Sequence, residues 1–532
     1  MATEILLVML AAIGLAIFAE RFKLQPPLLL VAVGLGLSFV PGIEPPALEP
    51  ETILAIVVPP LLYSAALDFS FFSFVKRIAA ILNLSVALVF ASAAAVAFAA
   101  VALMPALPLA VAFILGAALA PPDAVSAVAI GRELGLPSRL MTILKGESLV
   151  NDAAALALFG VATAWALSGA EHPGSVTLAF LYAAIVGALV GMLIGRIVDR
   201  IRRRLEDPSL VTTLSVLVPF SAYALAERVH ASGVVAVVFA GFTLSHRAAD
   251  LGFAGRIQER EVWGVVDKLL ETFAFAYMGL QLRSLMLEAQ ADGYALRQLA
   301  GIAIALLVVV IGVRVVWIVA SELLARVRRR WSPRAQPLSW AEDAVLGWSG
   351  MRGVVTLAAA AATPVHTWAG EPLAGRSAIV LLAYVVAVGT LLLHGLTLPL
   401  LVRRLKLPPD DAEALHGQKK HAKSVMHGAA RATLTGLSHE QFSAAELALA
   451  EKLMNRQAAA VQAAQELAGE GGSPTVPRLR LLTIGRAVLA AQRQALIAER
   501  DAQRLDDEVL RELLEGLDLE QALLAQKAQH LA

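Results

Sequence analysis

Long apolar stretches recur along this chain from residue 4 to about residue 402, each close to the roughly 20 residues that an α-helix needs to cross a bilayer. Hydrophobic residues make up 58% of the 532 residues and charged residues only 16%, whereas a soluble domain carries about 25% charged residues. The pattern predicts an all-α membrane protein with about thirteen transmembrane helices, at residues 4–21, 27–40, 51–67, 78–104, 109–131, 138–168, 175–198, 209–227, 232–246, 262–282, 298–325, 340–364 and 375–402.

The chain changes character after Leu407-Pro408-Pro409, which predicts a transmembrane domain at 1–406 and a cytoplasmic helical tail at 407–532. Helical periodicity in the tail is strongest at 438–467 and 480–528, on either side of a glycine-rich break. Its apolar positions should pack on a partner helix or on the tail itself: Leu489, Leu496, Ile497, Leu510, Leu513, Leu514 and Leu517. A stabilising or assembly role is favoured over regulation.

Basic residues gather in alternate loops, and short loops rich in Lys and Arg stay in the cytoplasm. The loops concerned carry Arg21 and Lys23, Lys76 and Arg77, Arg132 and Arg139, Arg196 to Arg204, Arg247 to Arg260, Arg326 to Arg334, and Arg403 to Lys406. The N-terminus is therefore expected outside and the C-terminus inside. The first apolar stretch is expected to remain as a helix, because its positive charges follow it rather than precede it.

Two functional classes find no support in the composition. The chain has no cysteine, which excludes disulfides, thiolate metal sites and cysteine nucleophiles. Its formal net charge of +1 gives no case for binding nucleic acid.

Polar side chains interrupt the apolar segment 138–168 at Gly146-Glu147-Ser148-Leu149-Val150-Asn151-Asp152. A carboxylate at bilayer depth costs roughly 2.5 to 3.5 kcal/mol on insertion scales, so such residues usually line an ion or proton path. Spacings of three and four residues place four polar side chains on about half of the helix surface, namely Glu147, Ser148, Asn151 and Asp152. That face offers oxygen ligands.

A second constellation, Ala120-Pro121-Pro122-Asp123, lies within the segment 109–131. Two prolines in mid-span remove backbone donors and break the helix, which leaves carbonyl groups free at membrane depth. Asp123 and Asp152, with Ser148, Asn151 and these carbonyls, could then form a site for a small monovalent cation, because oxygen ligands without thiolate or imidazole suit Na⁺ or its neighbours. The alternative for Asp123 is to cap a kinked helix.

Buried carboxylates of this kind can hold either a proton or a cation near neutral pH. When the proton leaves, the cation can enter, and the reverse. Competition for the same oxygens is therefore a mechanism of exchange.

Arg352, in Gly350-Met351-Arg352-Gly353, is a further charge in the middle of an apolar segment. A buried guanidinium needs a carboxylate, and Glu147 is the expected partner in a structural ion pair. Direct repulsion of the bound cation by Arg352 is the alternative. Four glycines are candidate points for a second helix break opposite Pro121 and Pro122: Gly350, Gly353, Gly389 and Gly395.

Three more polar residues lie within apolar segments. For Arg314 and Glu271, pairing at a helix end or between helices is favoured over a role in transport. For His394, an ordinary hydrogen bond is favoured over a pH-sensitive role.

In these motifs the chain resembles the monovalent cation/proton antiporter superfamily, in its bacterial sodium/proton exchanger branch. Besides the segments containing Asp123, Asp152 and Arg352, the resemblance rests on Val58-Pro59-Pro60-Leu61-Leu62-Tyr63, Met278-Gly279-Leu280-Gln281-Leu282 and Leu393-His394-Gly395-Leu396-Thr397. It implies inverted repeats of six helices, two crossing broken helices, a homodimer and an elevator-like movement of a core domain.

By position, the resemblance makes Asp152 the carrier of cation and proton, with Asp123 and Ser148 completing the site. Asn151 becomes the neighbour that marks electroneutral exchangers, and Glu147 with Arg352 the stabilising pair. One departure concerns selectivity: many relatives have Thr before this Asp and Pro after it, whereas Pro122 and Ala124 stand here. A hydroxyl ligand is thus missing, and K⁺ stays open as an alternative.

The sequence therefore predicts an electroneutral Na⁺(Li⁺)/H⁺ antiporter, and not an enzyme, in a bacterial inner or plasma membrane. No cofactor is expected; the partners are monovalent cations, protons, the bilayer and a second copy of the chain. A K⁺(Rb⁺)/H⁺ antiporter of the same fold is the first alternative. An ion channel and a membrane ion sensor are weaker ones.

Overall fold

The fold is known from a computed structural model of the chain. It describes residues 2–43, 55–68, 71–123, 127–128, 130–131, 134–168, 174–205, 207–247, 251–329, 338–407, 412–437, 475–502, 504–505 and 507–529. These residues form helices, with one isolated β-bridge between His366 and Pro372. They divide into two compact units, the first made of 1–247 and 259–409 and the second of 248–258 and 410–532.

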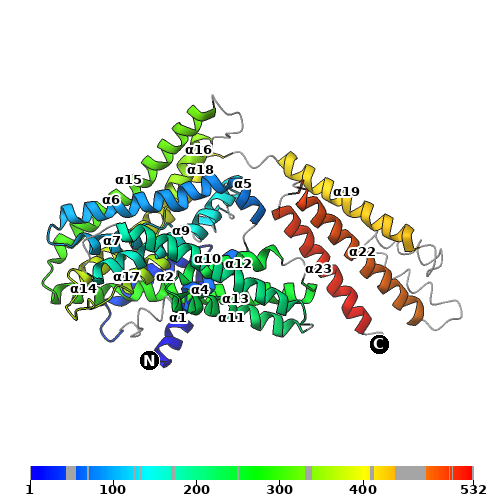
Figure 1. The fold of residues 1–532 in the computed structure, drawn as a ribbon, viewed down its shortest axis with the longest axis horizontal. Coiled ribbons are helices and arrows are strands. Elements are labelled where there is room, and N and C mark those ends of the chain that lie inside the picture. The colour runs from blue at the N-terminus through cyan, green and yellow to red at the C-terminus, as the bar shows by residue number, and fades with distance from the viewer. Residues whose placement is uncertain are drawn as a thin grey trace. The chain divides into compact units, whose positions relative to one another are not determined.

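Figure 1 labels the helices of the described residues. Those of the first half of the chain are α1 (Ala2–Arg21), α2 (Pro26–Ser38), α4 (Val58–Leu67), α5 (Phe71–Leu82), the π-helix η1 (Asn83–Ala87), α6 (Leu88–Leu103), α7 (Leu109–Leu119), α9 (Ser138–Ser168), α10 (Gly174–Arg202), α11 (Pro208–Arg228) and α12 (Gly233–His246).

The second half continues with helices of very different length. They are α13 (Phe253–Leu280), α14 (Leu282–Ala291), α15 (Leu296–Arg329), α16 (Trp340–Trp348), α17 (Val354–Ala361), α18 (Arg376–Leu405), α19 (Ala412–Leu437), α22 (Thr475–Asp501) and α23 (Asp507–Gln529).

Six of the described helices are long and apolar enough to cross a membrane: 77–103, 139–168, 178–202, 208–228, 296–327 and 376–405. Four shorter apolar helices accompany them, namely α2, α4, α7 and α12. The prediction of a helical fold is confirmed for the described residues, and these helices have the length and composition that a membrane protein needs. The count of thirteen crossings stays a prediction, since several predicted segments correspond to helices of 8 to 14 residues.

Close helix contacts explain one of the sequence motifs. Gly279 of α13 lies against Gly34 of α2, where a Cβ on Gly279 would come within 2.7 Å of the Gly34 Cα. The neighbouring carbonyl of Met278 accepts a hydrogen bond from the hydroxyl of Tyr384 on α18, at 2.8 Å. The Met278-Gly279 pair therefore serves helix packing.

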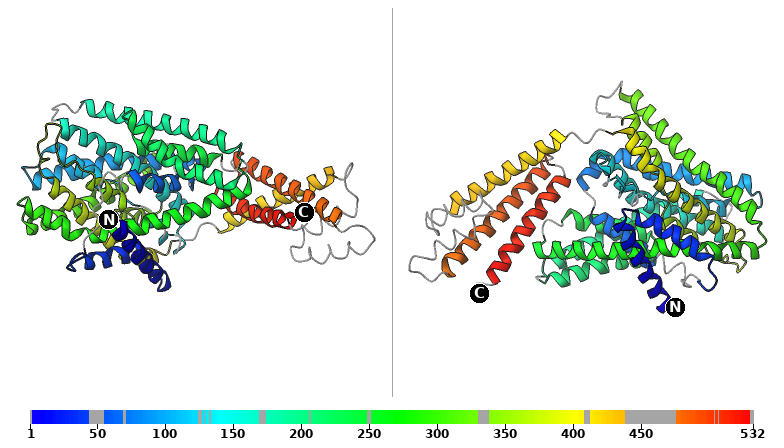
Figure 2. Two further views of the ribbon diagram at one scale, coloured as in Figure 1. Left: turned by 90° about the horizontal axis from the view of Figure 1, so that it is seen from below. Right: turned by 180° about the vertical axis from the view of Figure 1, so that it is seen from behind.

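The second unit consists of α19, α22 and α23, which lie side by side in the views of Figures 1 and 2, together with residues 248–258. The predicted packing of the tail on itself is confirmed, since its buried core includes Leu489, Leu496, Leu510 and Leu517. Two details of the prediction were wrong. Helix α19 was missed, and the single helix expected at 480–528 is two helices that end at Asp501 and begin again at Asp507. The helix expected at 438–467 lies outside the described residues.

Candidate functional site

Two helix breaks lie against each other in the first unit. Helix α7 ends at Leu119, and Pro121, Pro122 and Asp123 follow without helical structure. Helix α16 ends at Trp348, and α17 begins only at Val354. The backbone N–H of Asp123 donates a hydrogen bond to the carbonyl of Met351, and a Cβ on Gly353 would clash with the carboxylate of Asp123. Glycine at 353 therefore permits the two breaks to meet.

Arg352 binds the main chain of both breaks. Its side chain donates to the carbonyls of Leu119 (3.0 Å) and Ala120 (3.4 Å) at the end of α7, and to that of Gly350 after α16. Its own N–H donates to Thr390 Oγ1 at 3.1 Å. Helix C-termini carry partial negative charge, so a guanidinium that is 1% exposed is stabilised here by carbonyl groups.

Helix α9 brings Asn151 and Asp152 to the first break. The side-chain amide of Asn151 donates to the carbonyl of Pro122 at 2.9 Å, and its Oδ1 is buried without a partner among the described atoms. Asp152 is 8% exposed and lies within electrostatic range of Asp123, which itself is half-buried. The carboxylates of Asp123 and Asp152 and the side chain of Asn151 thus come together at the first break, where the carbonyls of Leu119, Ala120 and Pro122 already accept hydrogen bonds from Arg352 and Asn151.

Ser148 is the one predicted ligand that the geometry does not join to the others. It lies half-buried on α9, one turn before Asp152. None of the described contacts connects its hydroxyl with Asp123 or Asp152. Its role as a ligand stays a prediction.

The ion pair of Glu147 was assigned to the wrong arginine. Arg314 of α15 donates through Nη1 to Oε1 of Glu147 and through Nη2 to Oε2, the latter at 3.0 Å. Arg314 also binds the carbonyl of Leu346 on α16, at 2.9 Å. Arg352 is held by carbonyl groups instead of this carboxylate, since it lies on the break itself. The prediction that Arg314 pairs between helices is confirmed.

Two of the four candidate break glycines were also wrong. Gly389 and Gly395 lie inside the continuous helix α18. Cβ atoms there would come within 2.6 Å of side chains on neighbouring helices, Leu307 of α15 and Leu28 of α2 respectively. These glycines allow helices to approach, whereas Gly350 and Gly353 lie on the break.

The pairing expected for Glu271 of α13 is not among the described hydrogen bonds and ion pairs, and the sequence did not place this residue near the breaks. Glu271 stands in the electrostatic field of Asp123 and of Asp267, one turn earlier on the same helix. Asp267 accepts a hydrogen bond from Ser64 of α4 through one oxygen, and its other oxygen is buried without a partner among the described atoms. Lys268, the nearest basic residue along the chain, pairs with Glu20 instead. The sequence held one signal for this arrangement: Asp267 and Glu271 are four residues apart, which places both carboxylates on one face of a helix.

The candidate site consists of side-chain oxygens from separate segments of the chain. Among the described residues, no group of three or more Asp, Glu, His or Cys side chains is placed to hold a metal ion. Two carboxylates and an amide oxygen are ligands of the type that alkali cations prefer.

Comparison with known proteins agrees with this geometry. The model of the transmembrane sodium/hydrogen exchanger family matches residues 6–404, which include both breaks, Asp123 and Asp152. This chain is a member of the sodium/hydrogen exchanger family. The family consists of secondary transporters and not of enzymes. Membership of this family supports cation/proton antiport as the activity of the chain.

This exchanger is similar in sequence to exchangers and antiporters of several organisms. An uncharacterized Na⁺/H⁺ exchanger of Mycobacterium tuberculosis is 31% identical over 517 residues, 96% of this chain and 94% of that protein. The Na⁺/H⁺ antiporter ApNhaP of Aphanothece halophytica is 31% identical over 418 residues, 77% of this chain and 76% of that protein. A sodium, potassium, lithium and rubidium/H⁺ antiporter of Bacillus pumilus is 29% identical over 457 residues, 83% and 67% of the two chains.

The fold of this exchanger has a solved counterpart. The sodium proton antiporter MjNhaP1 of Methanocaldococcus jannaschii superimposes with a TM-score of 0.59 at 18% sequence identity, covering 76% of this chain and 97% of that chain. At this identity the comparison establishes the shared fold.

Proposed function

We propose that the chain is an electroneutral Na⁺(Li⁺)/H⁺ antiporter that works by alternating access at the crossing of its two broken helices. The observation that carries the proposal is Asp152: it is buried, lies near Asp123 and has no hydrogen bond or ion pair among the described residues. A buried carboxylate without a counter-charge needs a bound proton or a bound cation. Either one satisfies it, which is the basis of exchange.

The buried charges support a stoichiometry of one cation for one proton. Glu147 and Arg314 neutralise each other in a closed pair. Besides Glu271 of α13, the charges at the crossing are the guanidinium of Arg352 and the carboxylates of Asp123 and Asp152. One further positive charge makes this set neutral. A single cation supplies that charge, and so does a single proton, so one-for-one exchange moves no net charge.

The choice between Na⁺ and K⁺ depends on the oxygens that surround the ion. Pro122 and Ala124 provide no hydroxyl at the positions flanking Asp123, and Asn151 already occupies the carbonyl of Pro122. A site with fewer fixed ligands imposes less size selection, which favours K⁺(Rb⁺)/H⁺ exchange as the second candidate. The relative from Bacillus pumilus, named for transport of Na⁺, K⁺, Li⁺ and Rb⁺, supports keeping this alternative.

The architecture expected around the site belongs to the same proposal. Residues 1–406 would form the transport domain in a bacterial plasma membrane, with inverted repeats, an elevator-like movement and a homodimeric assembly. The N-terminus would be external and the tail at 407–532 cytoplasmic. Its support is the alternation of basic loops and the resemblance to exchangers with these features.

Reconstituted liposomes test the proposal. Proton-coupled flux should appear with Na⁺ and Li⁺ across a pH gradient and should stay the same when a membrane voltage is imposed. Because one proton competes with one cation, the apparent KM for Na⁺ should rise about tenfold for each pH unit below the titration of the site. Asp152→Asn removes the exchangeable charge and should abolish flux in a protein that still folds. Voltage-dependent flux, or full flux by Asp152→Asn, would refute the mechanism. Flux driven by K⁺ at the same rate as flux driven by Na⁺ would select the second candidate.

A further inference from the structure

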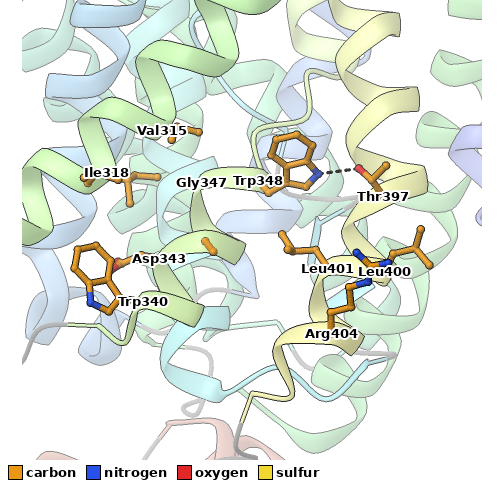
Figure 3. A pocket seen from close by; sticks show the side chains of 12 residues that line it. Val315, Ile318, Trp340, Asp343, Gly347, Trp348, Thr397, Leu400, Leu401 and Arg404 are labelled. Carbon is orange, nitrogen blue, oxygen red and sulfur yellow. Dashed lines mark hydrogen bonds between the residues drawn. The ribbon is translucent and has the colours of Figure 1, made fainter.

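A groove of about 620 Å³ opens beside the transport site between α15, α16 and α18 (Figure 3). Its floor is the short helix α16 and its walls are α15 and α18. The residues that line it are Val315, Ile318, Val319, Trp340, Asp343, Ala344, Gly347, Trp348, Thr397, Leu400, Leu401 and Arg404. Most of this lining is apolar.

The groove runs along α16, which is much shorter than its neighbours. Helix α16 has 9 residues, about 13 Å of helix, whereas α15 has 34 and α18 has 30. Val315, Val319, Trp340 and Leu400 are each more than a third exposed. In a chain embedded in a bilayer, exposed apolar side chains along a groove are covered by hydrocarbon, because leaving them in water costs about 25 cal/mol per Å².

Polar groups occur at the end of the groove where α15 and α18 end and α16 begins. On the α18 wall, Arg404 is exposed and lines the groove, with no acidic side chain among its described hydrogen-bond partners. The opposite side carries an ion pair and one further acidic side chain. Arg326 lies over the ring of Trp340 at 3.9 Å and pairs with Glu322 at 3.0 Å, and the buried Asp343 adds a negative charge. An anion is therefore attracted to the α18 side of the opening.

We propose that this groove is a binding site for one anionic phospholipid, with its phosphate at Arg404 and its acyl chains along α16. Basic groups at the opening of a groove between transmembrane helices suit the headgroup of an anionic lipid. Tryptophan at the same level, as at position 340, is typical of the boundary between headgroups and hydrocarbon. The proposal is independent of which cation the exchanger carries.

A lipid bound in the groove would act on transport through α16. The inner end of the groove is lined by Gly347 and Trp348, and the helix break begins at the next residue, Ser349. The indole N–H of Trp348 donates to Thr397 Oγ1 of α18 at 2.8 Å, as Figure 3 shows. An acyl chain in the groove thus packs on α16, which leads directly into the break that contains Arg352 and Gly353.

Native mass spectrometry of the delipidated full-length protein tests the site, with phosphatidylglycerol and phosphatidylcholine of identical acyl chains as probes. The wild type should bind its first phosphatidylglycerol at least about fivefold more tightly than phosphatidylcholine, the preference expected of one charge-assisted contact. Arg404→Gln should remove the preference, and Arg404→Lys should retain most of it. Arg403→Gln, which deletes the same charge one residue earlier and outside the groove, should behave like the wild type.

The acyl-chain part of the site is tested by filling the groove. Ala344→Phe should weaken binding of both lipids by about fivefold or more, while Val308→Phe, a lipid-facing change on α15 outside the lining, should not. Should Ala344→Phe lower the unfolding temperature, Val319→Trp fills the same groove from the other wall. The proposal is overturned when Arg404→Gln and Arg403→Gln affect the preference equally, or when the filling variants bind lipid as the wild type does.

Discussion

Asn151 of α9 donates its side-chain amide to the carbonyl of Pro122, 2.9 Å away, at the point where α7 has lost its helical hydrogen bonds. The bond connects the helix that carries Asp152 with the break that carries Asp123. It also supplies a hydrogen-bond donor to the carbonyl of Pro122. The residue next to Asp152 therefore ties α9 to the segment that carries Asp123.

Replacing Asn151 by Ala should destabilise the protein by about 1 to 3 kcal/mol, because the buried carbonyl of Pro122 loses its donor. The apparent KM for the cation should rise at the same time, since the two carboxylates are no longer held together. Thermal unfolding and flux in liposomes measure the two effects. Asn83→Ala, which removes a comparable bond to Ser321 at 3.0 Å away from the site, should lower stability and leave the KM unchanged. An unchanged KM in Asn151→Ala would speak against the positioning role.

The pairing of Glu147 with Arg314 should appear as a large coupling energy. Arg314→Ala leaves a buried carboxylate without its partner, which typically costs about 3 to 5 kcal/mol. Adding Glu147→Ala should recover a substantial part of that loss, because the stranded charge is removed. Unfolding free energies of the two single variants and the double variant give the coupling. The same cycle with Arg352→Ala in place of Arg314→Ala should give a clearly smaller coupling, and equal couplings would contradict the assignment.

These arginines show what the sequence could and could not determine. Charge within an apolar segment identified Glu147, Asp152 and Arg352 as members of a buried polar centre. Spacing along one helix also predicted that Asn151 and Asp152 share a face. The choice between Arg314 and Arg352 as partner of Glu147 depends on how three helices pass one another, and no spacing along the chain carries that information.

The two helix breaks make the same point. Pro121 and Pro122 lack backbone N–H groups, so the first break was visible in the sequence. For the second break, glycines at 350, 353, 389 and 395 were equally acceptable locally. Packing separates them, because Gly389 and Gly395 make room for Leu307 and Leu28. In the tail, likewise, the uninterrupted periodicity of 480–528 gave no sign of the turn before Asp507, where Leu505 enters the core at 2% exposure.

Glu271→Gln should weaken cation attraction without stopping exchange. The carboxylate stands in the field of Asp123 and keeps the same shape when neutralised. Removing one negative charge from a partly solvated position weakens the binding free energy of the cation by on the order of 1 kcal/mol. This corresponds to about a fivefold higher KM. The maximal rate should stay within about twofold, since Asp152 still carries the ion. Flux at several Na⁺ concentrations measures both quantities.

The matched variant for this position is Asp267→Asn, one turn earlier on α13. Asp267 is in the field of Asp68, with Asp123 not among its electrostatic partners, and it acts in turn on Glu271. Its effect on the KM should therefore be smaller than that of Glu271→Gln. A complete loss of flux in Glu271→Gln would instead make Glu271 a carrier of the transported ion, and an unchanged KM would return it to a purely structural role.

Asp518 should be the residue on which the second unit most depends. It is 2% exposed and accepts hydrogen bonds from Arg256, whose Nε lies 2.8 Å from Oδ2, and from Arg493. Asp518→Asn removes the charge between two guanidiniums and should cost about 3 to 5 kcal/mol, seen as faster proteolysis of the tail in the full-length protein. Asp501→Asn provides the control, because that carboxylate is 63% exposed in its pair with Arg500 and should be worth less than about 1 kcal/mol. Equal proteolysis of the two variants would mean that the apolar core of the tail, and not Asp518, holds residues 248–258 to the tail helices.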